Sequence, residues 1–247
     1  MHSSSYFVPT PKRKIIEENL KKNDETRKRE IHHRIKNNLQ VISSLLDLQA
    51  EKFKGKKDIK DSEVLEAFME SQDRVISMAL IHEELYKGGR HDTLNSSSYL
   101  EKLVDNLFLT YRLGNSEIKL NMDLEENLFF DMDTAVPLGI IVNELVSNSL
   151  KHAFMGRDEG EIRIKLCREE SDENTNFTLA ISDNGVGIPE NIDIEDLDSL
   201  GFQLVTSLVD QLDGELELKR NNGTEFIIRF TLTEESNQES APKQLVE

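Results

Sequence analysis

The chain of 247 residues is poor in cysteine and in long apolar runs, and its 30 Lys and Arg residues are outnumbered by 47 Asp and Glu residues. Its single cysteine, Cys167, excludes an internal disulfide and a zinc site built on cysteines, and it suits a reducing cytosol. No apolar run is long enough to cross a bilayer, and the start, MHSSSYFVPTPKRK, lacks the apolar core of a signal peptide. We therefore expect a cytoplasmic protein with no membrane segment.

The charged residues are unevenly distributed along the chain, whose net charge is −17. Residues 1–60 hold 15 Lys and Arg against 8 Asp and Glu, and the remainder holds 15 against 39. The basic residues near the start interleave with Glu and Leu at helical spacing, which is not typical of an arm that binds a phosphate backbone. Because the rest is strongly acidic, we expect no nucleic-acid partner.

The first third of the chain has two long patterns of helical spacing. The first predicts a helix over about residues 14–54 that stops near Gly55, and the second predicts a helix that breaks at Gly88-Gly89. Such helices form a hairpin, and two hairpins pair into a four-helix bundle. Because a single hairpin leaves an apolar stripe exposed, we expect a homodimer. The stripe of the first helix consists of Ile31, Ile35, Leu39, Ile42 and Leu46.

Strand and helix patterns mix in the rest of the chain and predict an α+β sandwich, with helices on one face of a mixed sheet. We expect a tail over 1–13, the helical hairpin over 14–92, this second domain over 93–234 and a disordered tail over 235–247. Within the second domain we predict helices over 99–113, 136–154 and 201–212, strands over 118–125, 161–167 and 177–182, and a hairpin over 215–232.

One polar patch, IVNELVSNSLKHAF over 141–154, lies within a predicted helix. An Asn carbonyl oxygen such as that of Asn148 is a reasonable Mg²⁺ ligand, since Mg²⁺ often binds through few protein groups and substrate phosphates. Lys151 lies one turn on, and a lysine there offsets phosphate charge. The alternative is a solvated polar face beside an apolar stripe. The patch also contains Asn143, Glu144 and His152.

Two glycine-containing patches follow. In ISDNGVGIPE, a strand ends at Asp183, whose carboxylate suits an exocyclic amine such as that of adenine, and Gly185 and Gly187 let the backbone approach a ligand. The alternative is a plain turn. In LGFQLVTSLVDQLDG, Gly201 opens a helix whose N-terminus suits an anion. The acidic stretch between the two patches resembles a lid.

In this order, NELVSNSLKH, DNGVGIP and GTEFIIRF resemble the N, G1 and G2 boxes of the Bergerat ATP-binding fold, which histidine kinases share with gyrase-type topoisomerases, Hsp90 chaperones and MutL repair proteins. The resemblance implies a site for Mg²⁺ and ATP. Asp183 would contact adenine, Asn148 would hold Mg²⁺ and Lys151 would approach the phosphates. Glu144 matches the general base of the ATP-hydrolysing members. The walls of the nucleotide site would be formed by Gly185, Gly187 and Gly201. The same boxes also contain Asn143, His152 and Thr224.

The stretch EIHHRIKNNLQ, residues 30–40, places two histidines within the first helix. At about 100° per residue, His33 falls almost opposite the apolar stripe and shares the solvent-facing side with Glu30 and Asn37, whereas His32 falls on the shoulder of the stripe. A neutral histidine has a ring lone pair for nucleophilic attack, and a nearby carboxylate can take its N–H proton. The alternative is a solvated surface histidine.

This helix resembles the phosphoacceptor segment of sensor histidine kinases, in the HWE-like subgroup with the pattern HRxKNNLQ. The resemblance implies that His33 is phosphorylated, that the phosphoryl group passes to an aspartate of a response regulator, and that Asn37 serves hydrolysis of the receiver phosphate. Arg34 follows the histidine where the commoner subgroup has an acid, so we propose Glu30 as the local acid. No sensor domain is recognisable, so the chain is a fragment or takes its input from another protein.

The predicted function is therefore an ATP-dependent protein-histidine kinase. The alternatives are a nucleotide-binding dimeric switch, a phosphatase-biased regulator with little kinase activity, and a serine kinase of the anti-sigma type. The last shares the ATP-binding fold but has no need of the long hairpin. The G2 region also departs from the family at Ser199 and Phe202, where many kinases have Gly and Leu, and this puts the lid contacts in question.

Overall fold

The computed structural model describes residues 43, 46–47, 49–51, 53–56, 58–87, 93–111, 117–170, 175–189, 199–220 and 222–232. The predicted phosphoacceptor residues Glu30, His33 and Asn37 lie outside this part of the chain, as do both predicted tails and the predicted lid. Among the described helices, none has the length and apolar character needed to cross a membrane.

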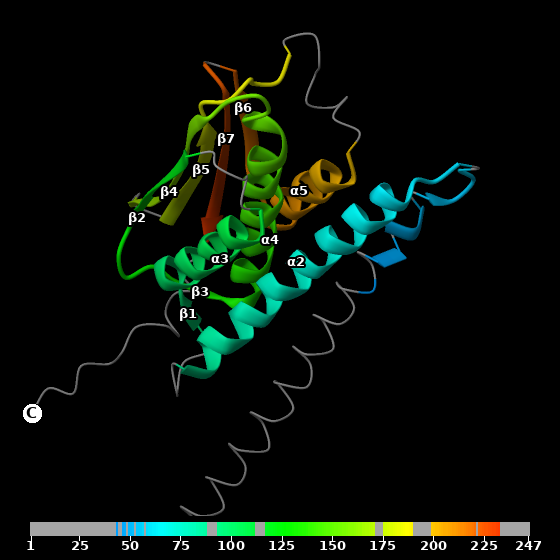
Figure 1. The fold of residues 1–247 in the computed structure, drawn as a ribbon. Helices are drawn as coiled ribbons and strands as arrows, with labels where there is room; N and C mark the ends of the chain where they lie inside the picture. The colour runs from blue at the N-terminus through cyan, green and yellow to red at the C-terminus, as the bar shows by residue number, and fades with distance from the viewer. Residues whose placement is uncertain are drawn as a thin grey trace, which may run out of the picture. The chain divides into compact units, whose positions relative to one another are not determined.

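The second helix of the predicted hairpin is α2, Asp61–Lys87, and the predicted break at Gly88-Gly89 lies outside the described residues. Helical residues also precede it, and they end in a turn at Lys54 and Gly55, where Gly55 has a φ of +82° that favours glycine. This α2 helix belongs to the same compact unit as the sheet, Leu46–Glu247. It contacts helices α3, Ser96–Thr110, and α4, Met132–Asn148 (Figure 1).

The sheet has five strands in the order β2-β4-β5-β7-β6. Strands β2 and β4 are parallel, and the other neighbours are antiparallel, so the sheet is mixed as predicted. Strands β6 and β7 form the predicted hairpin. The strand bounds are β2 Glu117–Leu124, β4 Glu159–Glu170, β5 Thr175–Asp183, β6 Glu215–Lys219 and β7 Thr224–Leu232.

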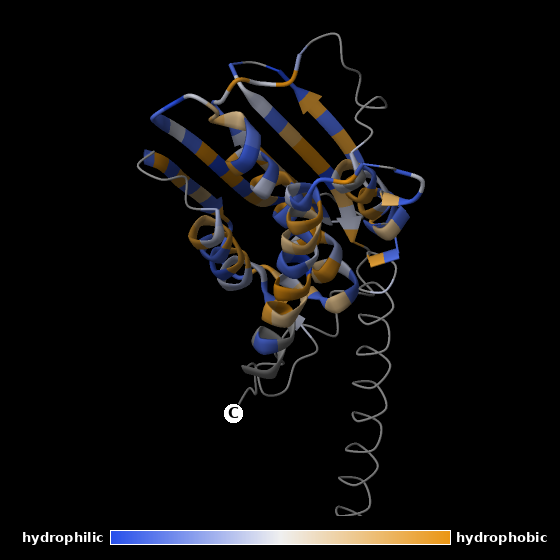
Figure 2. Cartoon of the chain, turned by 45° about the vertical axis from the view of Figure 1, so that its right-hand side comes forward, coloured by the Kyte–Doolittle hydropathy of each residue, from blue (hydrophilic) through white to orange (hydrophobic). Residues whose placement is uncertain are grey.

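Alternating side chains give the sheet one apolar face, which appears as alternating colours along the strands in Figure 2. In β5, for example, Phe177, Leu179 and Ile181 are buried while the residues between them are partly exposed. An aromatic cluster closes one part of this core, with Phe177 stacked on Phe230 at 5.3 Å between ring centroids and Phe130 edge-on to Phe177 at 5.2 Å.

Three α-helices cover the apolar face of the sheet: α3, Ser96–Thr110, α4, Met132–Asn148, and α5, Leu200–Gln211 (Figure 1). Helix α4 is central, because it contacts α2, α3 and α5, and all but one of its residues before Asn148 are buried. A helix that is apolar nearly all round needs such cover on every side. The polar side chains of α4 therefore either line the pocket described below or contact another helix.

Two details of the helix predicted over 136–154 were wrong. The helix begins earlier, at Met132, where the Asp131 side chain caps it by accepting a hydrogen bond from Thr134 N at 2.9 Å. It also does not stay α-helical to its end, because the π-helix η1, Ser149–Ala153, follows α4. A π-turn changes the angular position of every residue after it.

A small two-stranded sheet was not predicted. Strand β1, Thr93–Asn95, pairs antiparallel with β3, Phe129–Asp131. Each strand has three residues, too few to show an alternating pattern. The strands lead directly into α3 and α4, and Asn95 caps α3 by accepting a hydrogen bond from Ser98 N at 3.0 Å. They fix where these two helices begin.

Candidate functional site

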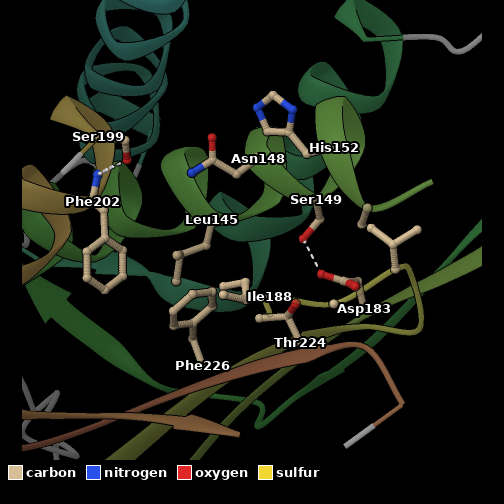
Figure 3. Close-up of a pocket in the computed structure, with 13 residues that line it drawn as sticks. Leu145, Asn148, Ser149, His152, Asp183, Ile188, Ser199, Phe202, Thr224 and Phe226 are labelled. Atoms are coloured by element: carbon tan, nitrogen blue, oxygen red, sulfur yellow. Dashed lines mark hydrogen bonds between the residues drawn. The ribbon is translucent and has the colours of Figure 1, made fainter. Parts of the chain in front are cut away.

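A cavity of about 250 Å³ opens between the end of α4, η1, the loop after β5 and strand β7 (Figure 3). One part of its wall is apolar, with Leu145, Ile188, Phe202 and Phe226. The rings of Phe202 and Phe226 lie 5.8 Å apart. The other part is polar, which gives the cavity the mixed lining typical of a small-molecule site. The polar lining residues are Asn148, Ser149, His152, Asp183, Ser199 and Thr224.

Asp183 lies at the end of β5, on the floor of this cavity. Its carboxylate is held on both oxygens: Oδ2 accepts a hydrogen bond from Ser149 Oγ at 2.9 Å, and Oδ1 accepts one from Gly185 N at 2.9 Å (Figure 3). A carboxylate has about four acceptor positions, so two remain for a ligand. The carboxylate is therefore oriented in advance and still able to accept hydrogen bonds from an amine.

The loop after β5 lies tightly against the end of η1. A Cβ added at Gly185 would lie 2.3 Å from Ala153 O, so only glycine allows this approach. The backbone of the next residue, Val186, donates to the same Ala153 carbonyl at 2.9 Å. Gly187 has a φ of +75°, which favours glycine. The two glycines thus fix the loop as one wall of the cavity.

Asn148 is the last residue of α4, and it lines the cavity together with His152 (Figure 3). Within the described residues, no side chain bonds to the Asn148 amide, whose oxygen is therefore available to a ligand. No group of three or more His, Cys, Asp or Glu residues in this part of the chain is suited to hold a metal ion. A metal here would take few protein ligands, which fits Mg²⁺ bound largely through phosphates.

The start of α5 forms another wall. Ser199 caps the helix, accepting a hydrogen bond from Phe202 N at 3.3 Å, and Phe202 lines the cavity. These two residues are the departures from the family pattern in the sequence, and here they have clear local roles. A serine cap satisfies a free N–H group at the helix start, and a phenylalanine supplies apolar surface.

Other polar residues of α4 and η1 face α2 instead of the cavity. The buried Arg74 and Glu144 side chains are 1% and 6% exposed and form a bidentate ion pair, with 2.6 Å from Nε to Oε1 and 2.8 Å from Nη2 to Oε2. Ser77 Oγ donates to Asn143 Oδ1 at 3.2 Å, and Asn143 Nδ2 lies 3.4 Å from Glu144 Oε1. Asn143 therefore supports Glu144 and is 2% exposed.

Glu144 also borders the first turn of α5. A Cβ added at Gly201 would lie 2.5 Å from Glu144 Oε2 and 3.9 Å from Arg74 Nη2. Burial alone would lower the pKa of the Arg74 guanidinium, but the hydrogen bonds and charge of Glu144, together with the charge of Glu70, raise it more. Among the described residues, none accepts a hydrogen bond from the buried Arg74 Nη1. A charged cluster thus lies directly behind the start of α5.

Lys151 belongs to the same contact with α2. Its Nζ lies 3.1 Å from Glu70 Oε1 and 5.0 Å from the centre of the Tyr111 ring. The Tyr111 hydroxyl in turn donates a short hydrogen bond to the buried Asp73 carboxylate. Burial raises the pKa of Asp73 above its ordinary value, while the Tyr111 hydrogen bond and the Lys151 charge lower it by less.

The structure gathers five of the predicted nucleotide-binding residues around one cavity: Asn148, His152, Asp183, Gly187 and Thr224. Gly185 lies directly behind it. Asn143, Glu144, Lys151 and Gly201 do not line the cavity, and the first three face α2. Sequence reasoning missed Glu70 and Arg74, although Glu70, Asp73, Arg74 and Ser77 recur at helical spacing as a polar stripe on α2.

Two protein families match this chain. The family described as "Histidine kinase" matches residues 30–111. The family described as "Histidine kinase-, DNA gyrase B-, and HSP90-like ATPase" matches residues 133–234, which include every residue that lines the cavity. The two matched ranges agree with the two resemblances found in the sequence.

Similar proteins carry related names. Sensor histidine kinase PdtaS of Mycobacterium tuberculosis is 32% identical over 207 residues, which cover 81% of this chain and 38% of PdtaS. Blue-light-activated histidine kinase 2 of Erythrobacter litoralis is 27% identical over 207 residues, which cover 82% of this chain and 56% of that protein. The chain thus spans roughly two fifths to just over half of these curated relatives.

Among solved structures, the histidine kinase domain of the Erythrobacter litoralis EL346 blue-light activated histidine kinase has a TM-score of 0.60 and 21% identity. The match covers 84% of this chain and 100% of that domain, and it supports the predicted fold of a helical region followed by an α+β sandwich. The chain therefore belongs to the histidine kinases, with an HWE-like helical region followed by an ATPase domain of the Bergerat type.

Proposed function

We propose that this chain is an ATP-dependent protein-histidine kinase that phosphorylates its own His33 and transfers the phosphoryl group to an aspartate of a response regulator. The observation that carries the proposal is the Asp183 carboxylate, held on both oxygens at the floor of a half-apolar cavity. A carboxylate oriented in this way suits the exocyclic amine of adenine, and the family match over residues 133–234 supports ATP as the nucleotide.

The base would lie between the apolar side chains of the cavity. Leu145 and Ile188 present aliphatic surface, and Phe202 and Phe226 present aromatic surface on which a flat ring can pack. Thr224 and Ser149 lie beside Asp183 and supply hydroxyl groups for the polar edge of the base. In this arrangement the adenine amine would lie toward Asp183, and the phosphates would lie toward Asn148 and His152.

Mg²⁺ would be held by the Asn148 amide oxygen together with the nucleotide phosphates, where it neutralises charge on the transferred phosphoryl group. Lys151 would approach the phosphates, and Gly201 would let the first turn of α5 come close to them. Glu144 and Asn143 are packed behind this turn against Arg74 and Ser77. Asn143 would therefore act on the nucleotide only through Glu144.

In the proposed reaction, a ring nitrogen of His33 attacks the γ-phosphorus, and the bond to the bridging oxygen of ADP breaks. ADP leaves with that electron pair, and Glu30 takes the proton from the other ring nitrogen. A carboxylate oxygen of an aspartate in the receiver domain then attacks the phosphorus, the N–P bond breaks, and the proton held by Glu30 returns to the imidazole ring. Asn37 would serve hydrolysis of the receiver phosphate.

We further propose that the chain acts in the cytoplasm as a homodimer. The exposed apolar side chains on α2 support this proposal, since Leu65 is 62% and Phe68 68% exposed, and Val75 continues the same face of the helix. Pairing of two hairpins would bury this face. The signal would reach the kinase from a sensor domain of the same protein or from a separate sensor protein.

Nucleotide titration tests the site. We expect Asp183→Asn to weaken ATP binding by about 10- to 100-fold, because a hydrogen bond to a charged group contributes about 1.5–3 kcal/mol. Asp123→Asn is the matched control, since this carboxylate on β2 is 77% exposed and lies outside the cavity. GTP has an oxygen in place of the amine, so its binding should change far less. Wild-type affinity of Asp183→Asn for ATP would contradict the assignment.

A further inference from the structure

Lys151, which the proposed function directs to the phosphates, is bound to α2 in this structure. Its Nζ donates to Glu70 Oε1 at 3.1 Å and lies 5.0 Å above the Tyr111 ring. The Lys151 side chain is 12% exposed and that of Glu70 is 20% exposed, so the pair is largely removed from water. Lys151 does not line the cavity, whereas Asn148 and His152 on either side of it do.

Glu70 is itself fixed from a second direction. Its Oε2 accepts a hydrogen bond from Gln49 Nε2 at 3.1 Å, and Gln49 is 5% exposed. Gln49 precedes the turn at Gly55, within the helix that the sequence predicts to carry His33. One carboxylate therefore joins the lysine of the ATPase domain to both helical segments of the hairpin.

A lysine has a flexible stem and a compact charge, so its ammonium can change partners without a change in the helix that carries it. The phosphates of ATP and the Glu70 carboxylate are both anionic and would compete for the same ammonium group. The ion pair between Lys151 and Glu70 is lost when Lys151 turns to a phosphate. The free energy of ATP binding is therefore less favourable by the free energy that this ion pair provides.

We propose that Glu70 is a positioning residue that holds Lys151 away from the nucleotide phosphates and thereby sets the affinity for ATP. The proposal rests on the function proposed above, because it assumes that Lys151 contacts the phosphates in the loaded enzyme. It adds a residue of the hairpin to the control of the nucleotide site. Any rearrangement of the hairpin that separates Glu70 from Lys151 would tighten ATP binding.

The test is calorimetric titration of the whole chain with ATP and Mg²⁺, and separately with adenosine, for wild type and Glu70→Gln. Glutamine keeps the shape and the acceptor for Gln49 but removes the charge. We expect Glu70→Gln to bind ATP about fivefold more tightly, the factor that a partly exposed ion pair supports. Adenosine affinity should not change, because adenosine has no phosphate.

Two further variants separate this effect from a general change in packing. Glu63→Gln makes the same change two turns earlier on α2, where Glu63 pairs with Lys56 at 3.7 Å away from the cavity, and it should bind ATP like wild type. In a Lys151→Met background, Glu70→Gln should no longer tighten ATP binding, since no ammonium remains to be released.

The outcomes are distinct. If wild type binds ATP and Glu70→Gln binds it equally well, the inference is wrong and the proposed function stands. An equal gain for adenosine, or a gain that persists with Lys151→Met, would also overturn it, because Glu70 would then act on the cavity's shape. If wild type does not bind ATP at all, the proposed function fails first and the inference fails with it.

Discussion

The ion pair between Arg74 and Glu144 gives the sharpest prediction about stability. The two side chains are 1% and 6% exposed, and they join α2 to α4 through two hydrogen bonds of 2.6 and 2.8 Å. Removal of one partner leaves the other charge buried and unpaired, at a cost of about 3–5 kcal/mol. We therefore expect Arg74→Met to reduce the free energy of unfolding by about 3–5 kcal/mol at neutral pH.

A double change, Arg74→Met with Glu144→Leu, removes both charges of this pair and should recover most of the loss, since apolar pairs often replace buried ion pairs at little cost.

Urea unfolding followed by far-UV circular dichroism measures these differences. Arg163→Met is the matched control, because Arg163 pairs with Glu161 at 2.7 Å on the surface, where its side chain is 65% exposed, and its removal should leave the unfolding midpoint unchanged. A loss below about 1 kcal/mol for Arg74→Met would refute the reasoning, since that value is typical of a hydrated surface pair. A double variant no more stable than the single one would also refute it.

Three further predictions concern other residues. Burial is the main reason why the pKa of Asp73 is raised above 3.8 in the folded chain. The folded state therefore binds the Asp73 proton more tightly than the unfolded state does. The free energy of unfolding should fall as the pH rises from about 3.8 through the folded pKa. Urea unfolding of Asp73→Asn at several pH values should show a smaller fall, and an equal fall would contradict the cause given. Gly185→Ala should lower stability by about 1–3 kcal/mol, because its Cβ would lie 2.3 Å from Ala153 O, and an unchanged unfolding curve would speak against this packing. Glu30→Gln should slow autophosphorylation and leave the titrated affinity for ATP unchanged, whereas an unchanged rate would remove Glu30 as the local acid.

Most of the fold could be predicted from periodicity, because each long element shows its own pattern. Strand β5 alternates buried and partly exposed residues, and α2 is helical over Asp61–Lys87, where the sequence has helical spacing. The three-residue strands β1 and β3 could not be found in this way. The early start of α4 could have been predicted from its capping residue, although not from periodicity. Asp131 lies three residues before Thr134 and accepts a hydrogen bond from its backbone N–H.

The cavity was also largely predictable, whereas the contacts of α4 with α2 were not. Asp183 and Asn148 lie in motifs that the family resemblance identifies, and both line the same cavity. Arg74 and Glu144 are 70 residues apart, and no local pattern pairs them. Lys151 lies within the π-helix η1, so a helical wheel drawn at 100° per residue no longer gives its direction after Asn148.

The most direct test of the proposed kinase function is incubation of wild type, His33→Gln and His32→Gln with ATP labelled on the γ-phosphate. We expect an acid-labile, base-stable phosphoprotein in wild type and in His32→Gln, and none in His33→Gln. Label that persists in His33→Gln would contradict the assignment of the phosphorylated residue. Label lost with His32→Gln alone would show that the helical register is wrong, and no label in any variant that still binds ATP would contradict the kinase function itself.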